Sequence, residues 1–123
     1  MAFTNALFDP MLDTAGNRID EVSLHAGEPD SDGSDEVDGG GYSRQEASWS
    51  SASSGAISAA AMTWPVPGDI TVTHAGLWTS GGTWLGAVEL SEEQVFTSPG
   101  SVTVDPLTLD MVTGEVSAQA TSR

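Results

Sequence analysis

Two segments of this chain have the same order of parts, and that order restricts the fold more than any other feature of the sequence. Each segment, residues 23–45 and residues 73–87, has a strand-like run, a reversal rich in glycine and a second strand-like run. Glycine adopts the backbone angles of a sharp reversal and permits a close approach of two strands. In the second segment these glycines are Gly76, Gly81, Gly82 and Gly86. The pattern predicts a sheet built from hairpins.

Further short runs of alternating apolar and polar residues predict that this architecture continues along the chain. They recur about every ten residues with turn signals between them, which is typical of an antiparallel sandwich or barrel. The predicted strands are residues 19–25, 42–49, 57–64, 70–78, 84–90, 95–96, 102–104 and 107–112. We therefore expect an all-β fold, an antiparallel β-sandwich or barrel-like domain.

The N-terminus departs from this β pattern. Apolar residues at positions i, i+4 and i+8 predict a short helical segment, which Pro10 shortens or kinks and Gly16 ends. The expected parts of the chain are a helical segment at 1–16, a β domain at 17–113 with an acidic loop at 28–41, and a polar C-terminal tail or contact arm at 114–123.

The net charge excludes several classes of partner. The chain has 18 acidic residues against three arginines, no lysine and a formal net charge of −15 at pH 7. Such a surface repels phosphate, so no nucleic-acid partner is expected. The sequence has no apolar run long enough to span a bilayer, so no membrane insertion is expected. The composition predicts adaptation to molar salt, where charges are screened beyond about 3 Å.

The acidic loop offers several carboxylates to a metal ion. They are Asp30, Asp32, Asp35 and Glu36. An EF-hand loop counted from Asp30 needs glycine at its sixth position and glutamate at its twelfth, but Asp35 and Gly41 stand there. A solvated loop is therefore the prediction, with a looser Ca²⁺ or Na⁺ site as the alternative. No other cofactor is expected.

The two histidines, His25 and His74, do not fit a catalytic or zinc site. Zinc would need further histidine or cysteine ligands at suitable spacing, and the chain has no cysteine. The Gly-x-Ser-x-Gly pattern of many serine hydrolases is also missing from the sequence. We expect both histidines to make local hydrogen bonds, and we predict no catalytic residue and no enzymatic activity.

The four tryptophans supply most of the bulky apolar volume of the chain. They are Trp49, Trp64, Trp78 and Trp84. We expect them in the core or at a subunit interface. In an alternative, Trp78 and Trp84 form a surface platform that stacks on sugars, and the chain is a carbohydrate-binding β module. Arg44, a cation among carboxylates, is expected to form an ion pair within or between subunits.

The two opening segments also carry a resemblance to a known family. They read Leu-His-x-Gly-x-Pro and Gly-Gly-Tyr-x-Arg-Gln around the acidic loop, then Thr-His-x-Gly-Leu-Trp and Gly-Gly-Thr-x-Leu-Gly. This pattern resembles the small virion structural proteins of tailed viruses, often described as tail-fibre-like or minor structural proteins. The similarity covers roughly Asn5 to Asp110. The acidic loop and the segment beyond Asp110 depart from it.

The resemblance implies a non-enzymatic building block that is used in many copies on a viral particle. The expected location is the virion exterior, either as capsid decoration or a turret, or as a tail, baseplate or fibre component. The expected partners are further copies of the chain, with a trimer plausible, the major capsid or tail proteins, and host-surface glycans. Assembly is expected in the cytoplasm of a host that lives in high salt.

Overall fold

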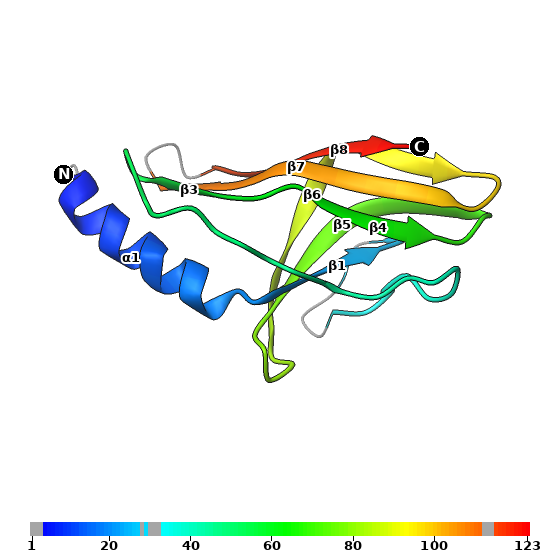
Figure 1. Ribbon diagram of the computed structural model, residues 1–123, viewed down its shortest axis with the longest axis horizontal. Helices are drawn as coiled ribbons and strands as arrows, with labels where there is room; N and C mark the ends of the chain where they lie inside the picture. Colours follow the sequence, from blue (N-terminus) through cyan, green and yellow to red (C-terminus); the bar gives the residue numbers. More distant parts are fainter. Residues whose placement is uncertain (1–3, 28, 30–32, 112–114) are drawn as a thin grey trace.

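The computed structural model describes residues 4–27, 29, 33–111 and 115–123, and this part of the chain is all-β with one N-terminal helix (Figure 1). The all-β prediction is therefore confirmed. The elements are α1 (Asn5–Arg18), β1 (Glu21–His25), β2 (Gln45–Glu46), β3 (Ala56–Ala59), β4 (Met62–Val66), β5 (Ile70–Trp78), β6 (Trp84–Phe96), β7 (Gly100–Asp110) and β8 (Glu115–Ser122).

The strands form one curled sheet in the order β2-β1-β5-β6-β8-β7-β3, with β4 also paired to β7. All neighbours are antiparallel except β6 and β8, which pair in parallel at Leu90 and Ala118. The sheet passes there from its β1–β5 half to its β7–β8 half (Figure 1). The indole N–H of Trp64 in β4 donates to the carbonyl oxygen of Val22 in β1 at 3.2 Å. The two halves therefore face each other across the core.

The core follows the two-residue period of the strands. Along β4 the buried and exposed residues alternate, and Trp64 at its centre is completely buried. The opposite half contributes Val22, Leu24 and Val72, which are also completely buried. One hydrophobic cluster contains residues from both halves. The core therefore lies inside the curl of the sheet, and the outer faces are left for other contacts.

The strands next to β7 are interrupted opposite a proline. β3 and β4 pair with β7 in one continuous register, but the ladder breaks at Ala60 and Ala61, opposite Pro106 and Asp105. On the side away from β7, the N–H of Ala60 donates to the carbonyl oxygen of Ser48 at 2.9 Å. The sequence predicts two separate strands around Pro106, whereas the structure joins them in β7.

The C-terminal segment differs from its prediction as a polar tail or contact arm. Residues 115–122 form β8, which pairs with β7 and joins the two halves of the sheet. The inward-facing residues of β8 are alanines, Ala118 and Ala120, and both are buried. Alanine is a weak strand former, so a strand with so little apolar bulk resembles a polar tail in the sequence.

The helix also extends beyond its predicted limit. α1 contains both Pro10 and Gly16, and it ends at Arg18. A Cβ atom on Gly16 would lie 3.3 Å from the Cβ atom of Trp49, so this glycine allows close packing of Trp49 against the helix. The predicted strand at 42–49 is reduced to the two residues of β2. No helix among the described residues is long and apolar enough to cross a membrane.

Candidate functional site

The two motif segments lie side by side because β1 and β5 are antiparallel neighbours. Ser23 lies opposite Gly76, and His25 lies opposite His74. The residues that alternate with Ser23 and His25 in β1 point into the core, so these two side chains lie on the outer face of the sheet. The residues packed there are called the motif cluster: Ser23, His25, Glu36, Tyr42, Arg44, Gly76, Trp78 and Trp84.

His25 is completely buried, and its hydrogen bonds define its protonation. Its Nδ1 lies 2.8 Å from the carbonyl oxygen of Ser34, which can only accept, so Nδ1 carries the proton. Nε2 then accepts from the hydroxyl of Ser23 at 2.6 Å, and that hydroxyl accepts from the indole N–H of Trp78 at 2.8 Å. Burial lowers the pKa of His25, despite the opposing effects of Ser34 and Glu36. His25 is therefore a neutral hydrogen-bonding link in the packed cluster.

Gly76 makes this packing possible. A Cβ atom at this position would collide with Ser23 Oγ, His25 Nε2 and the ring of Trp84. Trp84 packs its ring against His25 in an edge arrangement, with centroids 5.5 Å apart, and against Trp78 at 4.9 Å. Such edge-to-face contacts are favourable geometries for aromatic pairs. The glycine of the second motif therefore leaves room for side chains from both motifs.

Arg44 covers the cluster. Its guanidinium carbon lies 3.7 Å from the centroid of the Trp78 ring, which is a cation–π contact. Its Nε and Nη2 donate to the two carboxylate oxygens of Glu36 at 3.0 and 2.9 Å. The hydroxyl of Tyr42 donates to the same carboxylate at 2.8 Å and accepts the N–H of Leu24 at 2.9 Å. Arg44 thus forms its ion pair within the subunit.

The pKa directions show that this ion pair stays charged. Burial raises the pKa of Glu36, but hydrogen bonds from Arg44 and Tyr42 outweigh burial and hold it below its ordinary value. The bonds to Glu36 raise the pKa of Arg44. Burial raises the pKa of Tyr42, and Glu36 raises it further, so the phenol stays protonated. These groups are fixed donors and acceptors rather than acids or bases that work near neutral pH.

Part of the acidic loop packs on the motif cluster instead of being solvated throughout. A Cβ atom on Gly33 would lie 2.8 Å from two indole rings of the cluster, and its φ of 76° suits glycine. The N–H of Val37 donates to the carbonyl oxygen of Leu24 at 2.9 Å, and the side chain of Val37 is buried. Residues 33–37 therefore extend along β1 and cover the cluster.

The possible ion site in this loop stays a prediction. Asp30 and Asp32 lie outside the described residues. Asp35 is exposed, and Glu36 is paired with Arg44. Within the described part of the chain, no group of three or more histidine, aspartate or glutamate side chains could hold a metal ion.

The remaining predicted residues have separate places. Trp64 lies in the core, and half-buried His74 shares a hydrogen bond with the hydroxyl of Thr73 at 2.8 Å. Gly81 and Gly82 lie in the reversal between β5 and β6, and Gly86 has a φ of 150° within β6. None of these residues belongs to the motif cluster.

The proposed sugar platform of Trp78 and Trp84 is not a flat surface. Trp78 is only 7% exposed, and Arg44 covers its ring face. Trp84 meets Trp78 at an interplanar angle of 69°. The two rings therefore pack against each other and do not present coplanar faces to a sugar.

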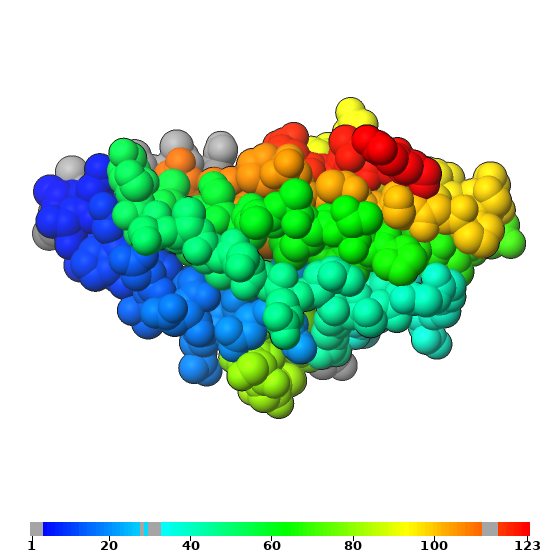
Figure 2. Space-filling view, viewed as in Figure 1, coloured from blue at the N-terminus to red at the C-terminus, as the bar shows by residue number. Residues whose placement is uncertain are grey.

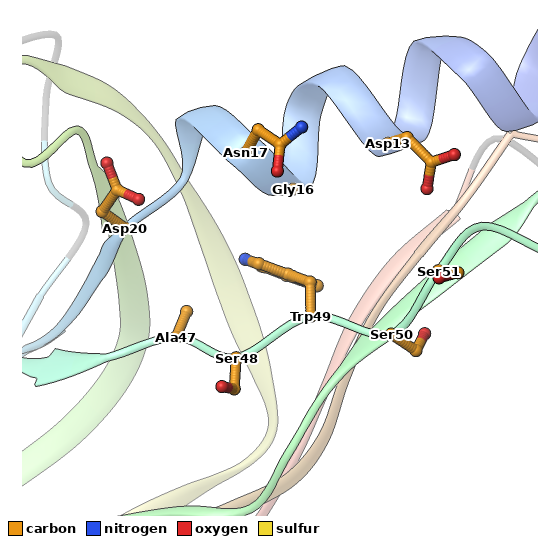
Figure 3. Close-up of a pocket in the computed structure, with 9 residues that line it drawn as sticks. All are labelled: Asp13, Gly16, Asn17, Asp20, Ala47, Ser48, Trp49, Ser50 and Ser51. Atoms are coloured by element: carbon orange, nitrogen blue, oxygen red, sulfur yellow. The ribbon is translucent and has the colours of Figure 1, made fainter.

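An open polar cleft lies elsewhere, between α1 and the segment before β3 (Figure 3). Its volume is about 580 Å³. The Trp49 cleft, as it is called below, is lined by Asp13, Gly16, Asn17, Asp20, Ala47, Ser48, Trp49, Ser50 and Ser51. Figure 3 shows the indole of Trp49 lying across the cleft, and its N–H donates to the carbonyl oxygen of Ile19 at 3.0 Å. A second pocket of about 280 Å³ shares Asp20 and Ala47 with it.

The sequence gives little sign of this cleft. Its walls come from the helix, from the turn into β1 and from residues 47–51, which are far apart in the chain. Of its side chains, only Trp49 stands out as a candidate in the sequence. Asp13, Asn17 and Asp20 look like ordinary polar residues of a helix and its end, because their convergence depends on how α1 packs.

Comparison with known proteins adds one finding. A family model described as "Podophage GP4 fiber I protein gp80" matches residues 20–112, which is about three quarters of the chain. The matched range contains the whole motif cluster and leaves out α1. No curated protein and no solved structure matches the chain.

Proposed function

The chain belongs to the Podophage GP4 fiber I protein gp80 family, and from this premise we propose that it is a non-enzymatic fibre component on the exterior of a tailed-virus particle. The family description favours a tail or fibre position over capsid decoration. The motif residues support a structural role, because hydrogen bonds, ring contacts and one ion pair connect them. In the described residues, no buried side-chain nitrogen or oxygen lacks a hydrogen-bond partner.

This placement is tested on the particle itself. Purified virions would be labelled with gold-conjugated antibody against the recombinant chain and imaged by electron microscopy. We expect gold at the tail or its fibres. Gold on the capsid surface would favour capsid decoration, and particles free of both the label and peptides of this chain by mass spectrometry would contradict the proposal.

We propose further that copies of the chain associate through the end of the molecule that carries α1, which is drawn in blue in Figure 2. Among the described residues, six large apolar side chains are exposed, and four of them lie there: Leu7, Met11, Met111 and Val116. Hydrogen bonds through Gly55 bring their elements together, since the N–H of Gly55 donates to the carboxylate of Asp9 and the N–H of Met111 donates to the carbonyl oxygen of Gly55. A concentration of exposed apolar side chains is typical of an interaction surface.

Light scattering after gel filtration tests this association. We expect an oligomer, a trimer being one stoichiometry, and a shift to monomer in a Leu7→Ser/Met11→Ser double variant. A Leu85→Ser/Val95→Ser variant, which changes the other two exposed large apolar residues of the described part of the chain, should keep the oligomer. A monomeric wild-type chain in both dilute and molar salt would contradict the proposal.

We also propose that the protein works in high salt. A net charge of −15 on 123 residues produces self-repulsion that molar salt screens. Thermal unfolding followed by circular dichroism should give a higher midpoint in 2 M KCl than in dilute buffer. Equal midpoints would count against salt adaptation. A sulfate-free salt keeps general effects of excluded ions small.

A further inference from the structure

We propose that the Trp49 cleft binds a neutral saccharide, and this inference rests on the proposed position of the chain on the virion exterior. The cleft combines one aromatic side chain with carboxylate, amide and hydroxyl groups. A sugar offers the matching chemistry, because it has apolar C–H faces and a ring of hydroxyl groups. The volume of about 580 Å³ lies within the usual range for small-molecule sites.

The indole of Trp49 is held in place for stacking. Its N–H is fixed by the carbonyl oxygen of Ile19, and its Cβ lies against Gly16. The side chain is only half-buried, and it is one of those that line the cleft. Figure 3 shows this ring between α1 and the 47–51 segment. An oriented aromatic ring with polar groups around it can select the face and the hydroxyl pattern of a sugar.

The carboxylates of the cleft are held in position by hydrogen bonds, and they keep further acceptor capacity for a ligand. One carboxylate oxygen of Asp13 accepts the N–H of Ala52 at 2.8 Å, and one of Asp20 accepts the N–H of Ser80 at 3.0 Å. The second oxygen of each carboxylate has no hydrogen bond to the described residues. The side chains of Asn17 and Ser51 likewise make none with that part of the chain. Fixed acceptors beside free amide and hydroxyl groups suit the paired hydroxyls of a sugar ring.

Charge decides which saccharides fit. The cleft has two carboxylates, and none of its lining residues is a cation. Uronic acids, sialic acids and sulfated sugars would therefore be repelled. A metal ion is not the better occupant, because no group of three or more suitable ligands is found among the described residues. The hydroxyl groups of a neutral sugar can donate hydrogen bonds to these carboxylate oxygens without this cost.

The length of the site points to more than one sugar unit. The second pocket continues from Asp20 and Ala47 toward Glu21, Glu46 and Ser80. The two pockets therefore adjoin at Asp20 and Ala47. We infer that the ligand is an oligosaccharide segment of a neutral surface polysaccharide, with one unit at Trp49.

The test is direct binding to the full-length chain by isothermal titration calorimetry and saturation-transfer NMR. The probes are neutral oligosaccharides prepared from dextran, mannan, galactan and cellulose, with oligogalacturonate and hyaluronan fragments as anionic controls. We expect at least one neutral oligosaccharide to bind and the anionic fragments not to bind. Failure of every neutral probe, or preferred binding of an anionic one, overturns the inference.

Matched variants place the binding in the cleft. Asn17→Ala and Ser51→Ala remove side chains that make no hydrogen bond in the described structure, so folding should be kept. We expect each to weaken binding at least fivefold, and Trp49→Leu to weaken it more than tenfold. Asn5→Ala, which changes the other asparagine of the helix outside the cleft, should bind as wild type. Unchanged binding by folded Asn17→Ala and Ser51→Ala variants would overturn the assignment to this cleft.

This outcome can be separated from that of the proposed function. If antibody labels the fibres but no neutral oligosaccharide binds, the chain is a fibre component and only the saccharide inference fails. If an oligosaccharide binds in the cleft but virions contain none of the chain, the fibre proposal fails while the binding site stands.

Discussion

Trp78 and Trp49 are both fixed by an indole N–H hydrogen bond, yet their surroundings are opposite. Trp78 is 7% exposed, donates to the hydroxyl of Ser23 and lies under the guanidinium of Arg44. Trp49 is half-buried, donates to a backbone carbonyl and lines an open polar cleft. Trp78 belongs to a motif, whereas Trp49 lies outside both motifs. The comparison teaches that the motif residue is packed among its neighbours, whereas the tryptophan outside the motifs lines an open cleft with polar groups around it.

The largest loss of stability is expected from Gly76→Ala in the motif cluster. The added methyl group would collide with Ser23, His25 and Trp84, and we expect a loss of about 3 kcal/mol in the free energy of unfolding, near the upper end for overpacked sites. Urea denaturation measures it. Gly81→Ala is the matched control, because its added Cβ would meet only Thr79 Oγ1 at 3.8 Å. Similar stability of the two variants would show that the motif cluster is not tightly packed.

The next test exchanges the two tryptophans for phenylalanine. Trp78→Phe leaves the buried hydroxyl of Ser23 without its donor, and we expect it to cost about 2 kcal/mol. Trp49→Phe should cost less, about 0.5–1 kcal/mol, because water can reach the half-exposed site. Urea denaturation monitored by circular dichroism compares them. A larger loss from Trp49→Phe would reverse the comparison between packed cluster and open cleft.

A smaller effect is expected from Glu36→Gln. The variant loses the charge that Arg44 and Tyr42 stabilise, which we expect to cost about 1.5 kcal/mol at pH 7, since the Glu36 side chain is 25% exposed. The folded pKa of Glu36 lies below its ordinary value of 4.5. Its contribution is therefore present above about pH 4.5 and lost as the pH falls through the folded pKa. The difference between wild type and variant should shrink in acid.

Urea denaturation at pH 7 and at successive acidic pH values measures this difference. Asp38→Asn is the control, because Asp38 is exposed and outside the network. A constant difference between wild type and Glu36→Gln across the acidic range would show that the Glu36 charge adds nothing to the cluster.

The smallest effect concerns His25. Burial lowers its folded pKa below the ordinary 6.5, so the unfolded chain binds a proton more readily than the folded one. Its contribution to stability is complete above about pH 6.5 and is lost as the pH falls toward the folded pKa. We expect a loss of about 1 kcal/mol between pH 7 and pH 5.5. The slope should vanish in His25→Gln and persist in His74→Gln, and identical slopes in both variants would contradict the assignment.

Much of the β architecture can be predicted from local sequence. The alternation along residues 70–78 predicts β5 with the bounds that the structure has, and the glycine reversal at 81–82 correctly separates it from β6. Both features depend on neighbours in the chain. Strand β8 depends instead on long-range pairing with β7, and its small inward side chains leave little local signal.

The motif cluster and the Trp49 cleft were less predictable, because both depend on contacts between residues far apart in the chain. His25 and His74 are correctly expected to make local hydrogen bonds, since isolated histidines without further ligands have few other uses. The hydrogen-bonded link from His25 through Ser23 to Trp78 needs the β1–β5 register. The Trp49 cleft needs the position of a helix that packs against the sheet through few residues, among them Leu12 and Gly16.

Pro65 in β4 and Pro67 just after it have a consequence for contacts between neighbouring molecules. β4 pairs with β7 on one side, and no described strand pairs with its other side. Pro65 lies inside this edge strand and Pro67 follows directly after it. An open edge invites strand addition from a neighbouring molecule, and proline blocks it because it offers no N–H. In the proposed oligomer, Pro65 and Pro67 would therefore protect neighbouring copies from edge-to-edge aggregation.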